Sequence, residues 1–155
     1  MPQSDRELIL TWWNEAWNEG LWAAAWGKSV EGLTAQQAAW RPPSAPGVTG
    51  ERRSIWQIVL HLVFWREASL HKLATGEKPS EEEIARGNFP AITDVSEAAW
   101  ADAKRRFAES HRRIAEILGD ESRDIGRLLY LLPHDAYHIG QINTLRAMQG
   151  LKPIE

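Results

Sequence analysis

Apolar residues recur every three or four positions in four long stretches of the chain, which is the period of an amphipathic α-helix. No stretch shows the strict alternation that is typical of a half-buried strand. The first helical stretch covers about 5–26. Ser4 and Glu7 have the spacing of a capping box at its start, and Gly27 follows its end. We therefore predict a first helix over 5–26.

Two more stretches predict long helices, each with a cap at its start and a glycine at its end. The second helix follows a long connection over about 28–53, begins after Ser54 and ends at Gly76. The third follows another long connection, begins after Ser96 and ends at Gly119. Both connections contain proline residues that cannot continue a helix.

The last helical stretch covers about 123–149 and contains Pro133. This proline either kinks one long helix or belongs to the first turn of a new one, and we favour a continuous but bent helix. Two long connections between four helices predict at least one crossover along the molecule. The expected fold is all-α, a four-helix bundle with long crossover connections.

The length and the net charge of the chain exclude some classes of protein. At 155 residues the chain is long enough to bury one substantial core, and we expect a single domain over 1–155. A net charge of −3 argues against a dedicated nucleic-acid binder. No apolar run reaches the length that a bilayer requires, and the start lacks a secretory pattern. We expect a soluble, cytoplasmic protein with neither nucleic acid nor membrane as partner.

Two unusual features of the composition bear on chemistry. The chain has no cysteine, so a metal ion would have to be held by nitrogen and oxygen donors, and any thiol would have to come from a substrate. The chain also has nine tryptophans, five of them in the first helical stretch. We interpret them as a bulky aromatic core, with ligand stacking as the alternative.

Three histidines are candidate metal ligands. His134 and His138 are four residues apart on the last helix, so both project from one face and can reach one ion. His61 interrupts the most apolar stretch of the chain, where a buried imidazole needs a partner. That partner is either a metal shared with the other two histidines or a backbone carbonyl or hydroxyl in the core, and the sequence leaves both open.

The remaining two histidines are weaker candidates. His111 falls near the apolar stripe of the third helix, but its polar neighbours predict a boundary position. His71 lies near the end of the second helix, where a cationic ring suits the helix dipole. We expect a surface or boundary role for both.

Three segments at characteristic distances carry a family resemblance. They are Trp40-Arg-Pro, Ser54-Ile-Trp-Gln-Ile-Val-Leu-His-Leu and Pro133-His-Asp-Ala-Tyr-His-Ile-Gly-Gln-Ile. In this order they resemble the landmarks of the DinB-like superfamily, and the resemblance extends over nearly the whole chain. It implies a four-helix bundle with a long crossover and a divalent metal ion held by His61, His134 and His138.

The resemblance also implies candidate activities. Characterised members of the superfamily include metal-dependent transferases that use low-molecular-weight thiols such as bacillithiol or mycothiol, and a thiol-dependent isomerase. Relatives are often homodimers, and the tryptophan-rich first helix offers apolar surface for a second copy. The expected partners are therefore a small-molecule substrate, a low-molecular-weight thiol and a second copy of the chain.

Other residues of the expected pocket can be named from their spacing. Trp65, one turn after His61, is expected to line an apolar wall. Gln141, three residues after His138, either contacts a ligand or makes a hydrogen bond on the helix surface. Asp135 could hold one of the histidine rings in place, yet its position next to His134 is expected to point it about 100° away from that residue.

Three ligands would leave a coordination position open, which is typical of catalytic and not of structural sites. Zinc or nickel suits imidazole ligands best. The favoured function is an enzyme that transfers a low-molecular-weight thiol to an electrophile, with metal-dependent hydrolysis as the nearest variant. The alternatives are a non-catalytic metal- or small-ligand-binding protein of a stress response, and polar packing without a metal.

Overall fold

The computed structural model describes residues 4–47, 49–152 and 154, and all regular elements in these ranges are helices. The four long helices are α1 (Asp5–Asn18), α4 (Ile55–Thr75), α6 (Glu97–Gly119) and α7 (Leu131–Met148). The short ones are α2 (Trp26–Ser29), α3 (Ala35–Ala39), α5 (Glu81–Gly87) and the 3₁₀ turn η1 (Leu128–Tyr130). The prediction of an all-α fold is confirmed. None of the described helices is long and apolar enough to cross a membrane.

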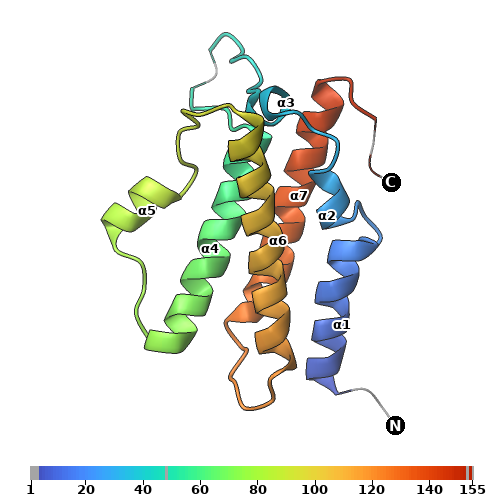
Figure 1. Cartoon of the computed structure of the whole chain (residues 1–155), viewed down its shortest axis with the longest axis vertical. Coiled ribbons are helices and arrows are strands. Elements are labelled where there is room, and N and C mark those ends of the chain that lie inside the picture. The colour runs from blue at the N-terminus through green and yellow to red at the C-terminus, as the bar shows by residue number, and fades with distance from the viewer. Residues whose placement is uncertain (1–3, 48, 153, 155) are drawn as a thin grey trace.

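The long helices lie side by side along the longest axis of the molecule (Figure 1). In that view α1 and α7 run upward, whereas α4 and α6 run downward. Because α4 and α6 are packed together and run the same way, the connection between them must return along the full length of α4. This connection, residues 76–96, carries α5. The predicted crossover is confirmed.

The core lies between these helices and is rich in large side chains. Its most enclosed tryptophans are Trp13 on α1 and Trp100 on α6, both almost completely buried. Each indole N–H finds a backbone carbonyl: Trp13 donates to His111 O (3.1 Å) and Trp100 donates to Leu33 O (3.0 Å). The interpretation of the tryptophans as core holds for these two and for the buried Trp26 and Trp56, whereas Trp22 is fully exposed.

The first helix is shorter than predicted. It ends at Asn18, because the next turn is broken by Gly20, which has a positive φ of 75°. A Cβ atom at Gly20 would lie 1.8 Å from the carbonyl oxygen of Ala23, so only glycine can occupy this turn. The predicted helix end at Trp26 is wrong, and Trp26 instead begins α2.

The start of the last helix also differs from the favoured prediction. α7 begins at Leu131, directly after the turn η1, and Pro133 belongs to its first turn. The missing N–H of a proline removes no hydrogen bond there, since the first four N–H groups of a helix have no partner within it. The continuous bent helix is therefore wrong, and the alternative of a new helix is confirmed.

Candidate metal centre

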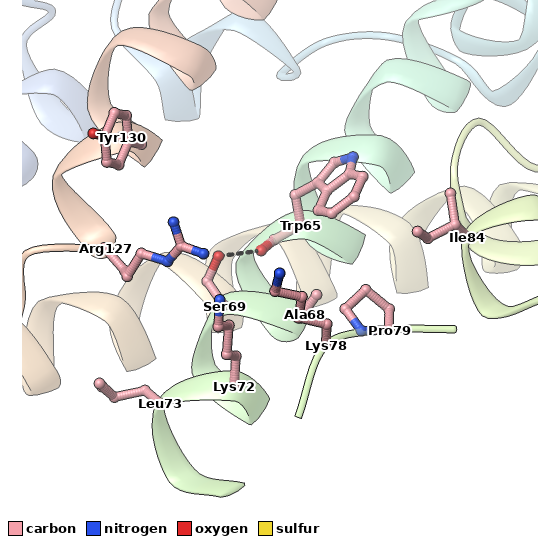
Figure 2. Close-up of a pocket in the computed structure, with 10 residues that line it drawn as sticks. All are labelled: Trp65, Ala68, Ser69, Lys72, Leu73, Lys78, Pro79, Ile84, Arg127 and Tyr130. Carbon is pink, nitrogen blue, oxygen red and sulfur yellow. Dashed lines mark hydrogen bonds between the residues drawn. The ribbon is translucent and has the colours of Figure 1, made fainter. Parts of the chain in front are cut away.

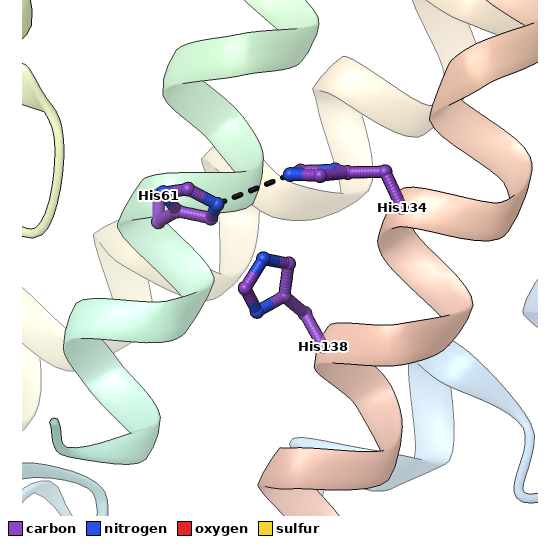
Figure 3. Close-up of side chains that lie close together, drawn as sticks. All are labelled: His61, His134 and His138. Atoms are coloured by element: carbon purple, nitrogen blue, oxygen red, sulfur yellow. Dashed lines mark hydrogen bonds between the residues drawn. The ribbon is translucent and has the colours of Figure 1, made fainter.

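Three histidines from two helices meet between α4 and α7. His61 projects from α4, and His134 and His138 project from neighbouring turns of α7 (Figure 3). One ring nitrogen of each lies within 4.8 Å of the other two. His61 and His138 are 6% and 8% exposed, while the side chain of His134 remains 32% exposed. The cluster is thus enclosed but open on one side.

The outer nitrogen of each ring is held by a side-chain oxygen. His61 Nδ1 lies 2.6 Å from Asn88 Oδ1, His134 Nδ1 lies 2.8 Å from Asp135 Oδ1, and His138 Nδ1 lies 2.7 Å from Gln141 Oε1. These oxygens can only accept, so each Nδ1 carries the proton and donates it. Such partners fix the ring orientation of metal-ligating histidines.

The inner nitrogens are therefore free of protons in the neutral rings. His61 Nε2 and His134 Nε2 nevertheless approach to 3.1 Å (Figure 3). Two lone pairs cannot form a hydrogen bond with each other, so this approach is favourable only where a proton or a metal cation lies between the two nitrogens. Two nitrogens bound to one tetrahedral zinc at 2.0–2.1 Å would be separated by about 3.3 Å. The geometry of the donor set fits a transition-metal ion.

The protonation state of the rings also fits a site that can bind a metal ion. Burial, and to a lesser extent the nearby His138 and His134, lowers the pKa of His61 to about 4 despite its hydrogen bond to Asn88. Burial also lowers the pKa of His138. Both rings are therefore neutral at pH 7, and a neutral imidazole is the form that binds a metal.

Asp135 contradicts the expectation that it would point away from its neighbour. Its side chain is completely buried and its Oδ1 accepts from His134 Nδ1. Its Oδ2 lies 2.7 Å from Nε of Arg66, a residue that was not predicted to belong to the site. Adjacent helical residues diverge by about 100°, but a carboxylate can curl back around the helix to an imidazole beside it. The expectation for Asp135 was wrong.

The crossover connection covers the centre with two residues that were not predicted as part of the site. Asn88 follows directly after α5 and its Oδ1 accepts from His61 and from the indole N–H of Trp65 (3.3 Å). An indole is a donor only, which identifies this Asn88 atom as the oxygen. Phe89 stacks on the His61 ring, with centroids 4.0 Å apart and planes at 11°. Trp65 is only half-buried and lines a cavity.

Gln141 makes hydrogen bonds on the surface of α7 and also lines a cavity, so both of its expected roles stay predictions. Its Oε1 holds His138, and its Nε2 donates to the hydroxyl of Tyr137 (3.1 Å). The same three side chains line a cavity of about 940 Å³ that opens beside the centre. A ligand in this cavity would contact His138 and Gln141 directly.

The two other histidines lie outside the cluster. His71 is exposed, and its Nε2 is 3.6 Å from Glu77 Oε2. His111 is 6% exposed and stacks on Trp13 with planes at 5°, so the predicted boundary position is wrong. It lies in the aromatic core because the α1 tryptophans close over it.

The fold and the centre together define an all-helical protein with three converging histidines that can hold a divalent metal. The chain belongs to the DinB superfamily, whose family model matches residues 19–142. The matched range includes all three histidines and covers most of the chain. Searches among curated protein sequences and among solved structures gave no significant match.

Proposed function

We propose that the protein binds one divalent transition-metal ion, zinc or nickel, through His61, His134 and His138, and uses it in catalysis. The observation that carries this proposal is the convergence of one ring nitrogen from each of three histidines, two of which lie 3.1 Å apart. Three protein ligands leave room for a substrate beside the ion.

The proposed reaction is transfer of a low-molecular-weight thiol to an electrophile, with hydrolysis as the nearest variant. A bound ion would supply a Lewis acid that makes a thiol or a water molecule nucleophilic near neutral pH. The chain supplies no thiol of its own, since it has no cysteine. Within the described residues the only carboxylate that hydrogen-bonds to the three rings is Asp135, and Arg66 already holds it.

The residues around the centre would orient the ligands and admit the substrate. Asn88, Asp135 and Gln141 hold the three rings with their Nε2 atoms inward. Phe89 covers His61 and keeps water from that side. The cavity beside His138 has a volume that suits a small molecule. These features support a small-molecule substrate held next to the ion.

Metal binding is tested by elemental analysis of protein purified without a histidine tag. We expect close to one zinc or nickel ion per chain, and loss of that ion in His138→Ala. His71→Ala is the matched control, because His71 lies outside the cluster and should leave the metal content unchanged. A well-folded wild type that takes up no metal would refute the proposal and support polar packing without an ion.

Catalysis is tested with the metal-loaded protein. Low-molecular-weight thiols are combined with a panel of electrophiles, and esters and amides are offered without a thiol. Metal-dependent turnover that disappears in His138→Ala supports an enzyme. Stoichiometric metal binding without turnover of any substrate would instead support the alternative, a metal- or small-ligand-binding protein of a stress response.

A further inference from the structure

A second cavity, of about 490 Å³, lies about one to three turns further along α4 from His61. Its walls are largely apolar and include Trp65, Leu73, Ile84 and the exposed ring of Tyr130 (Figure 2). Its polar lining is dominated by cations, namely Lys72, Lys78 and Arg127. We call this cavity the cationic pocket.

The three cations come from three separate segments. Lys72 belongs to α4, Lys78 lies in the connection before α5, and Arg127 directly precedes η1. Figure 2 shows their side chains reaching toward the same space beside Ser69. Partial desolvation, together with the charges of Arg127 and Lys78, lowers the pKa of Lys72. The three groups are thus close enough to repel one another.

In the described part of the chain, no acidic side chain forms an ion pair with these cations. Among the described residues, none of the three cations has a carboxylate oxygen within 4 Å. The nearby acids have other partners: Glu77 lies 3.6 Å from His71, and Glu83 accepts from the backbone N–H of Ser80 at 2.7 Å. A cluster of like charges around one cavity is unfavourable unless an anion enters it.

The cationic pocket adjoins the histidine centre. Trp65 forms part of its wall, and the indole N–H of Trp65 shares Asn88 Oδ1 with His61. The rings of His61 and Trp65 are 6.5 Å apart. On the other side, Tyr130 lies four residues before His134, about one helical turn. A small molecule in the cavity would therefore extend toward the three histidines.

We propose that the cationic pocket is an anion subsite, which holds a carboxylate or phosphate group of a small molecule whose apolar part packs on Trp65. Its volume suits a small ligand, and its concave shape favours a small molecule over a polymer. The view that this molecule is the substrate of the histidine centre rests on the proposed function. The subsite itself would exist with or without a metal.

The subsite is tested with three aromatic probes of similar size: phenyl phosphate, phenylacetate and the neutral phenylacetamide. Binding is followed by NMR through the indole N–H signal of Trp65, which is assigned by its loss in Trp65→Phe. We expect both anions to shift this signal in metal-free and in zinc-loaded protein. Their affinity should exceed that of phenylacetamide about ten-fold, the value of one charge-assisted contact. Whichever of the two anions binds with the higher affinity shows whether the subsite prefers a phosphate or a carboxylate group.

Substitutions of the pocket cations test whether the anionic probes bind in the cationic pocket. Lys72→Gln and Arg127→Gln should each lower the affinity for phenyl phosphate about ten-fold and leave the affinity for phenylacetamide unchanged. Arg113→Gln is the matched control, because Arg113 is exposed on α6 and its loss changes the net charge equally. Equal binding of charged and neutral probes, or equal loss in all three variants, would overturn the subsite.

The outcome is separable from that of the proposed function. A protein that holds one metal ion per chain but does not distinguish phenyl phosphate from phenylacetamide refutes the subsite alone. A protein that never takes up metal, yet binds the anions through Lys72 and Arg127, refutes the metal centre and supports the subsite.

Discussion

The Asp135 carboxylate joins the buried guanidinium of Arg66 to the imidazole of His134. Its Oδ2 lies 2.7 Å from Arg66 Nε and its Oδ1 lies 2.8 Å from His134 Nδ1. Both Asp135 and Arg66 are completely buried, and the guanidinium also donates to Phe107 O and Ser110 Oγ, each at 3.1 Å. The orientation of a candidate metal ligand is thus tied to the packing of α4, α6 and α7.

Replacing Asp135 should therefore affect both stability and metal binding. Asp135→Asn keeps the shape but removes the charge, which leaves the Arg66 cation buried without a counter-ion. We expect a loss of about 3–5 kcal/mol in the free energy of unfolding. We also expect metal affinity to fall roughly 10–100-fold, as is usual when the partner of a histidine ligand is changed. Urea unfolding and competition with a chelator measure the two effects.

The control is Asp102→Asn on the exposed face of α6. Asp102 also pairs with an arginine, Arg105, at 2.7 Å, but both side chains are more than half exposed. An exposed pair contributes little, so this variant should change stability by less than about 1 kcal/mol. Equal effects of the two substitutions would contradict a special role for the buried pair.

The course of the main helices could be predicted from the sequence because local signals agree with packing. Ser54 begins α4 and accepts from Gln57 N (3.1 Å), and Gly76 ends it with a φ of 80°. The predicted first helix is too long because the apolar period of the sequence continues past Asn18, where α1 ends. The local signal for this break is Gly20, which follows two polar residues and adopts a positive φ.

The site was predicted only as far as helical spacing and apolar context reach. His61, His134 and His138 could be found because two share a helix face and the third interrupts an apolar stretch. Asn88 could not be found, since its position depends on how the crossover connection folds over α4. The sequence does contain a signal for Arg66: it occupies a position on the apolar face of α4 and hence requires a buried partner.

Asn88 should tune the metal centre through His61. In Asn88→Ala, His61 Nδ1 and the Trp65 indole both lose their acceptor, so the imidazole can rotate or change its tautomer. We expect metal affinity to fall about ten-fold or more. Asn88→Asp should restore it, because a carboxylate accepts the same hydrogen bonds. Chelator competition measures both. If metal affinity falls as far in Asn88→Asp as in Asn88→Ala, the hydrogen-bond acceptor at this position does not tune the metal centre.

Metal removal should destabilise the fold. The ion would bind only where α4 and α7 are packed together, so the folded state is favoured by mass action. At a free zinc concentration of about 1,000 times Kd, the added stability is about 4 kcal/mol. Thermal unfolding with and without a chelator measures this difference. His138→Ala should show no response to zinc, whereas a response equal to that of the wild type would indicate binding elsewhere.

His111 should make stability depend on pH below neutrality. Its ring is stacked against Trp13 at 4.8 Å and Trp17 at 4.5 Å, and its Nδ1 has no hydrogen-bond partner. Burial, and secondarily the charge of Arg66, lowers its pKa to about 3 from an ordinary value of 6.5. Between these two pH values the unfolded chain binds a proton that the folded protein does not. Stability from this residue is thus full above pH 6.5 and is lost as the pH falls toward 3.

Substitution of His111 by phenylalanine isolates this effect. His111→Phe keeps an aromatic ring on Trp13 but cannot be protonated, so it removes the contribution of this residue to acid unfolding. Each pH unit corresponds to about 1.4 kcal/mol, so the variant should gain roughly 2–3 kcal/mol on the wild type between about pH 6.5 and 4.5. Urea unfolding at several pH values measures the gain. Between pH 7 and 9 the difference should stay constant, which serves as the internal control. A difference that is the same at pH 4.5 and at pH 7 would mean that His111 takes up its proton equally in both states.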